Sequence, residues 1–161
     1  MWQELLGVMQ KIAAAYTQLI KLQEEKRKAL GLLKVQAVAD IVSKEEALLK
    51  QVEEAENQRK ALLTQLLQNA GPRASQMRLQ ELFRLCKSPT LRQALETKRG
   101  QIDKLLKQSQ DLADANGTLA RGALLAIRHR LEKIGPSVAP TTYGMGGRSK
   151  QGLDKRFDYH A

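Results

Sequence analysis

Apolar side chains recur at alternating spacings of four and three residues near the start of the chain, and this period constrains the fold most strongly. The stripe runs through Leu5, Met9, Ile12, Tyr16, Leu19, Gln23, Lys26, Leu30 and Leu33. Because an α-helix completes a turn in about 3.6 residues, these positions share one helical face. Gln23 and Lys26 interrupt the stripe, which predicts either a polar layer against a partner helix or a less buried stretch. The sequence therefore predicts a long amphipathic first helix.

The period is lost over residues 33–40 and then resumes, which predicts a helix restart. Asp40 or Ser43 offers a capping oxygen, and Glu45 and Glu46 follow as first-turn acids. The second stripe runs through Ile41, Glu45, Leu48, Val52, Ala55, Arg59, Leu62 and Leu66. It ends at residues 69–72, Asn-Ala-Gly-Pro, which is a strong stop signal. We expect the first two helices to form a long antiparallel hairpin.

A short third helix is expected over about residues 75–87, and the longest helix follows it. Ser88 can cap this last helix, and Pro89 suits its first position. Its stripe runs through Leu91, Leu95, Lys98, Ile102, Leu105, Ser109, Leu112, Asn116, Leu119, Ala123, Ile127 and Ile134. Gly117 marks a place where the helix could break, and Gly135-Pro136 should end it.

The remaining segment, residues 136–161, has no helical period and is rich in glycine and proline. That composition cannot repay the entropy of ordering, so a flexible C-terminal tail is expected. The tail holds Tyr143, Phe157 and Tyr159, three of the six aromatic residues, which suits folding onto a partner. The alternative is that the tail docks on its own bundle or is dispensable. The predicted fold is all-α: an elongated, coiled-coil-like bundle over residues 1–135, with the tail behind it.

Positive charge is concentrated late in a chain of formal net charge +10. Residues 71–135 hold thirteen of the 27 Lys and Arg residues but six of the 17 acids. A basic stripe there could attract nucleic acid, an anionic membrane or an acidic protein surface. The simpler interpretation is a solvated helix face, since Lys and Arg are good helix formers.

The residues that carry chemistry do not form a site. Cys86 is the single cysteine, and His129 and His160 are the two histidines, so the spaced ligands of a zinc site are missing. No nucleophile, base and oxyanion donor can be assembled, and the glycine-rich residues 144–150 lack the order of a phosphate loop. We therefore expect no enzyme activity, no metal, no cofactor and no small-molecule substrate. The start of the chain lacks a secretion signal and no stretch could span a membrane, which predicts a cytoplasmic protein.

The order and length of these elements resemble the FlgN family of flagellar export chaperones. The second helix carries Glu56, Arg59, Leu62 and Leu63 in the corresponding place. Residues 116–119, Asn-Gly-Thr-Leu, are similar to the family's asparagine-rich stretch. Residues 143–147, Tyr-Gly-Met-Gly-Gly, resemble the tyrosine-glycine element of its C-terminal tail.

The resemblance implies a chaperone that binds the C-terminal helical segments of the hook-filament junction proteins, keeps them unassembled and delivers them to the export gate. Tyr143 would contact that gate. A client helix could lie along the bundle and complete an apolar stripe. On that basis the expected client-binding residues are Leu112, Asn116, Leu119, Ala123, Ile127 and Leu131. Chaperones of this type are commonly acidic, so the charge of +10 departs from the pattern and could mirror an acidic client.

Two other functions remain open. A coiled-coil adaptor or scaffold would form a homodimer through the first two helices without any client. A nucleic-acid-binding protein would use the basic segment 71–135, and its affinity would fall steeply with salt. This last reading ranks third, because the segment has no recognisable groove-reading motif and only Phe83 as an aromatic for base stacking.

Overall fold

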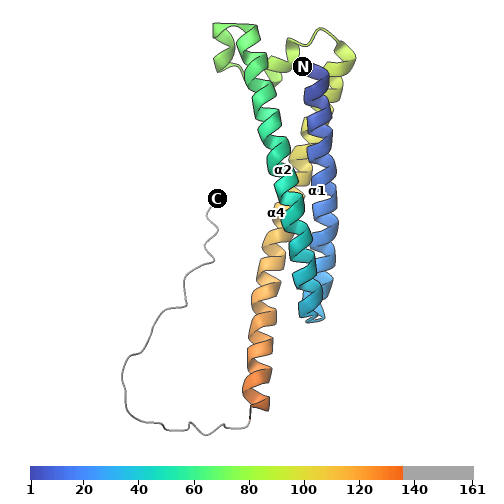
Figure 1. Ribbon diagram of the computed structural model, residues 1–161, viewed down its shortest axis with the longest axis vertical. Helices are drawn as coiled ribbons and strands as arrows, with labels where there is room; N and C mark the ends of the chain where they lie inside the picture. Colours follow the sequence, from blue (N-terminus) through green and yellow to red (C-terminus); the bar gives the residue numbers. More distant parts are fainter. Residues whose placement is uncertain (136–161) are drawn as a thin grey trace, which may run out of the picture.

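Three long helices make up most of the protein in the computed structural model, which describes residues 1–135 apart from the side chains of Arg73 and Ser75. They are α1 (Trp2–Gly31), α2 (Val35–Ala70) and α4 (Pro89–Ile134), with η1 (Pro72–Gln76) and α3 (Leu79–Arg84) between α2 and α4. Figure 1 shows that α1 and α2 form an antiparallel hairpin and that α4 runs alongside in the direction of α1. The described residues contain no strand, and the predicted all-α class is confirmed.

The second helix begins earlier than the sequence suggested. Leu33 adopts a left-handed backbone with φ of 54°, and the amide of Lys34 donates to the carbonyl of Ala29, 2.9 Å away. These two features reverse the chain so tightly that α2 starts at Val35 without a side-chain cap. Asp40 and Ser43 therefore lie inside α2, and the prediction that one of them caps it is wrong.

The connection from α2 to α4 is built from short pieces. Gly71 ends α2 with φ of 93°, a conformation that glycine adopts without the steric cost of a side chain. The single short helix expected over about residues 75–87 is instead the 3₁₀ turn η1 followed by α3. Ser88 accepts a hydrogen bond from the amide of Leu91 at 3.3 Å, so the predicted cap of α4 is confirmed. No break occurs at Gly117, and α4 is continuous to Ile134.

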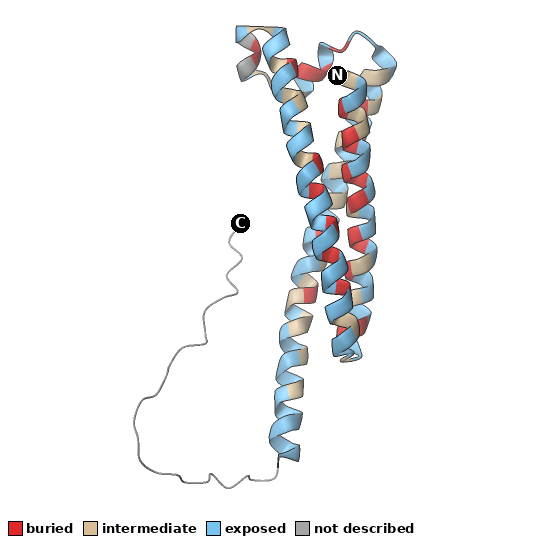
Figure 2. Cartoon of the chain, viewed as in Figure 1, coloured by how far each residue is buried: buried red, intermediate tan, exposed pale blue. Residues whose placement is uncertain are grey.

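The core is concentrated where the chain begins. It joins all four α-helices through Leu5, Met9, Leu66, Leu82, Phe83 and Leu95. Trp2 packs edge-on against Phe83, with ring centroids 6.3 Å apart. Burying each such side chain contributes about 1.5–3 kcal/mol, so this end anchors the bundle. Figure 2 shows that buried residues continue along the hairpin but become sparse toward the far end of α4.

Candidate functional site

The last helix extends past the tip of the α1–α2 hairpin, as Figure 1 shows. Asn116 lies against Gln23, and α1 ends at Gly31, eight residues after Gln23. Since both helices rise about 1.5 Å per residue, α1 stops covering α4 near residue 124. We call residues 121–134 the free end of α4: this segment begins about one helical turn before that point, and no other described helix packs along its final turns.

The free end exposes large apolar side chains. Leu124 is 50% exposed, Leu131 is 65% exposed and Ile134 is 74% exposed. A helix normally buries its apolar face, so a run of such side chains on one unpartnered segment indicates a surface for binding another protein. The sequence placed Ile134 on the stripe, but Leu124 was not among the expected binding residues.

The structure places the six expected client-binding residues, Leu112, Asn116, Leu119, Ala123, Ile127 and Leu131, along α4. Leu131 is exposed, Asn116 is buried, and the other four are partly buried. Ile127 and Leu131 belong to the free end beyond the hairpin, whereas Leu112 and Asn116 lie beside α1. Their role in binding stays a prediction. Tyr143, expected at the export gate, lies outside the described residues.

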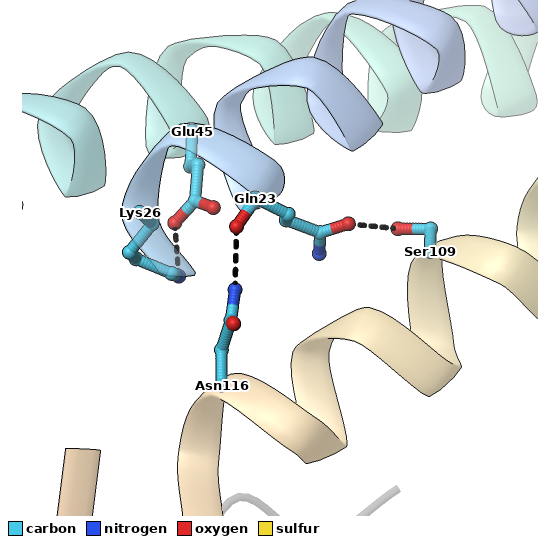
Figure 3. Close-up of polar contacts among 5 residues, drawn as sticks. All are labelled: Gln23, Lys26, Glu45, Ser109 and Asn116. Carbon is cyan, nitrogen blue, oxygen red and sulfur yellow. Dashed lines mark hydrogen bonds and ion pairs between the residues drawn. The ribbon is translucent and has the colours of Figure 1, made fainter. Parts of the chain in front are cut away.

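A polar layer crosses the bundle just above the free end, and Figure 3 shows its members. The side-chain amide nitrogen of Asn116 donates to the backbone oxygen of Gln23 at 2.8 Å. The hydroxyl of Ser109 donates to the side-chain oxygen of Gln23 at 3.2 Å. All three residues are buried, so these hydrogen bonds are shielded from water. The sequence predicted that Gln23 belongs either to a polar layer or to a less buried stretch of α1, and the polar layer is confirmed for Gln23.

An ion pair extends this layer to α2. The Lys26 ammonium lies 2.6 Å from an oxygen of the Glu45 carboxylate, and the two residues join α1 to α2 (Figure 3). The other carboxylate oxygen of Glu45 and the side-chain oxygen of Asn116 are buried without a hydrogen-bond partner. Burying unpaired oxygens costs stability, so the layer is a less stable section of the bundle than the apolar core.

Positive charge is also gathered at the free end. Arg121, Arg128, Arg130 and Lys133 are all exposed, and Glu132 is the acid among them. The part of the basic excess that lies on this segment therefore borders exposed apolar surface.

The hairpin tip contributes apolar surface that the sequence analysis missed. Leu32 and Val35 are each 66% exposed on either side of the turn at Leu33. The signal was present in the sequence, as five apolar residues among positions 32–38 with no helical period. It could not be interpreted without knowing that the chain reverses there.

The described cysteine and histidine side chains occupy positions that are common for structural and surface residues. Cys86 is buried, and its thiol lies 3.7 Å from the carbonyl of Ser88. His129 is exposed on the free end. Within the described part of the chain, no cluster of His, Cys, Asp and Glu could hold a metal ion. Among residues 1–135, no helix is both long and apolar enough to cross a membrane.

The fold is all-α, and the free end of α4 is an amphipathic helix segment that no other described helix covers. The family model described as FlgN protein matches residues 1–151. The match covers most of the sequence, and the chain therefore belongs to the FlgN family of flagellar export chaperones. The resemblance inferred from the motifs is confirmed. No curated protein and no solved structure matched the chain.

Proposed function

We propose that this chain is a cytoplasmic chaperone for the hook-filament junction proteins. It binds their C-terminal helical segments, prevents their premature assembly and delivers them to the flagellar export gate. The proposal rests on membership of the FlgN family together with the exposed apolar side chains at the free end of α4. The protein acts by binding alone, without catalysis, metal or cofactor.

The observation that carries the proposal is the uncovered stripe beyond the hairpin. Ile127 and Ile134 lie eleven and eighteen residues after Asn116, close to whole numbers of helical turns, so they share its face. Above the tip that face packs on α1, and below the tip it has no helix to pack on. A client helix placed there would occupy the position that α1 leaves and would bury the stripe.

The six proposed client-binding residues then divide by position. Ala123 lies level with the tip, and Ile127 and Leu131 lie below it; these three residues would contact the client directly. Leu112, Asn116 and Leu119 would mark the upper limit of the site, because Asn116 is already hydrogen-bonded to Gln23. A client reaching that far would have to displace α1 locally. Tyr143 is proposed to contact the export gate from the tail.

Co-purification from a flagellated host tests the proposal. The full chain and a form lacking residues 136–161 are isolated, and bound proteins are identified by mass spectrometry. Both forms should capture hook-filament junction proteins, and only the full chain should capture a component of the export gate. Recovery of the protein with itself alone would favour a scaffold, and recovery of nucleic acid removed by salt would favour the nucleic-acid hypothesis.

A further inference from the structure

The exposed cations of the free end lie on both sides of its apolar stripe. Successive residues of a helix are about 100° apart, and this spacing places Ile127, Leu131 and Ile134 together. The same spacing places Arg121 and Arg128 beyond one edge of that stripe. Arg130 and Lys133 lie beyond the other edge, so whatever covers the stripe is bordered by positive charge on two sides.

Little negative charge is present to balance these cations. Between Asp114 and Gly135 the sequence contains one acid, Glu132. We call the four cations Arg121, Arg128, Arg130 and Lys133 the rim of the stripe. A partner that covers the stripe displaces water from beside them and strengthens every charge interaction at the rim. Like charges across such a rim disfavour binding, and opposite charges favour it. The rim therefore selects partners by charge.

The position of the stripe also limits the partner's shape. The Asn116 side chain points at α1 (Figure 3), and the stripe below it faces the same way. The tip of the α1–α2 hairpin thus stands on the side from which the stripe must be approached (Figure 1). A flat membrane surface would meet the hairpin before it reached the stripe. A single helix fits, because it can lie end to end with α1.

Charge argues against two occupants supplied by the chain itself. A second copy that docked through its own free end would bring an identical set of cations against the first. Residues 136–161 hold four basic residues against two acids, so their net charge has the same sign. Both occupants therefore match the charge of the free end less well than an acidic segment of another protein does.

We infer that the partner of the free end is an amphipathic helix with acidic residues on both flanks of its apolar stripe. The inference rests on the proposed function for the existence of a client helix, and it adds the chemistry by which that helix is recognised. The acids pair with Arg121 and Arg128 along one edge and with Arg130 and Lys133 along the other. The charge of the chaperone thus acts in client selection.

Two designed helical peptides test the inference on the full chain. They share one leucine and isoleucine stripe and differ only at the flanking positions, which are glutamate in one and lysine in the other. The glutamate peptide should bind at least about tenfold more tightly, and its advantage should shrink as salt is raised, since exposed charges are screened. Equal affinities, the reverse order, or no binding of either peptide would overturn the inference.

Charge reversal locates the effect. Arg128→Glu combined with Lys133→Glu should remove or invert the preference between the peptides. Lys50→Glu combined with Lys60→Glu makes the same change in net charge on exposed positions of α2 and should leave the preference intact. If both pairs act alike, net charge rather than the rim is responsible and the inference fails.

Purified junction proteins separate this inference from the proposed function. Ile127→Asp should abolish their binding, and the Arg128→Glu/Lys133→Glu pair should weaken it at least about tenfold. Loss with Ile127→Asp but full binding with the charge-reversed pair would overturn the acidic-flank inference and leave the proposed function standing. If the unaltered chain bound the glutamate peptide selectively but no junction protein, the proposed function would fall instead.

Discussion

The side chain of Asn116 donates a hydrogen bond to the backbone oxygen of Gln23, two residues separated by 93 positions in the sequence. This contact ties α4 to α1 just before α4 leaves the hairpin. The apolar stripe of α4 is nearly continuous, so burial alone would allow α4 to pack at more than one register along α1. A buried polar contact penalises the wrong registers. We therefore expect Asn116, together with the apolar core around Leu95, to set how much of α4 extends past the hairpin.

Replacing Asn116 by alanine should lower the free energy of unfolding by about 1–3 kcal/mol, because it leaves a small cavity and removes a shielded hydrogen bond. Urea denaturation followed by circular dichroism measures the change. Asp114→Ala, an exposed change on the same helix, should stay within about 0.5 kcal/mol of the original protein. An Asn116→Ala protein as stable as the Asp114→Ala control would show that the layer is not needed for stability.

The Lys26 and Glu45 pair should behave as a coupled unit. Changing Glu45 to leucine strands a partly buried ammonium, and changing Lys26 to methionine strands a buried carboxylate. Each single change should cost about 1–3 kcal/mol, and the double change should cost less than the sum of the two. A double-mutant cycle by denaturant unfolding gives the coupling, and strictly additive costs would contradict it.

Tyr16 should make stability depend on pH in the alkaline range. Its burial raises the pKa of the phenol above the ordinary 10.0, and the carboxylate of Glu56 raises it further. The folded protein therefore holds this proton more tightly than the unfolded chain. The resulting stability is fully present below pH 10.0 and is lost as the pH rises through the raised pKa.

Denaturant unfolding of the original protein and of Tyr16→Phe at several pH values checks this dependence. The original protein should lose stability more steeply above about pH 10 than the variant does. Parallel curves for the two proteins would mean that Tyr16 titrates no differently in the fold.

The apolar stripe of the free end should matter for binding and not for folding. Leu131→Asp changes a side chain beyond the hairpin, so helicity should be nearly unchanged. The free energy of unfolding should stay within about 0.5 kcal/mol of the original value. Binding of a junction protein, measured by calorimetry, should fall at least about tenfold, because a buried unpaired carboxylate costs more than about 1.4 kcal/mol. Leu49→Asp on α2, at an apolar position of similar exposure, serves as the control. An equal loss of binding with Leu131→Asp and with Leu49→Asp would argue against a role of the free end in client binding.

Helical period and stop signals were enough to predict the main architecture. The stripes through Leu5 and Leu95 predicted which faces would be buried, and Gly71 and Ser88 marked where helices end and begin. The restart at Asp40 or Ser43 was wrong, because capping rules read the local sequence and do not see the backbone hydrogen bond that closes the turn at Lys34. Gly117 marked a place where α4 could break, and α4 is continuous there because no neighbouring backbone approaches the helix at that position.

The candidate site was only partly predictable. The sequence placed Ile127 and Leu131 together on one face of α4, since helical spacing determines a face. It could not show that α1 stops short of them, because the overlap of packed helices depends on their register, and register is set by contacts across the bundle such as that of Asn116 with Gln23. The exposed Leu32 and Val35 were missed for the same reason, as their surroundings are tertiary.

The central position of α1 has a consequence for the nascent chain. Gln23 and Ser109 hydrogen-bond across 86 positions, so α1 and α2 leave the ribosome well before the helix that covers them. During that interval the stripe of α1 that will pack on α4 is open to other chains, and such exposure favours aggregation. Until its last helix is synthesised, this chaperone itself exposes apolar surface that needs protection from other chains.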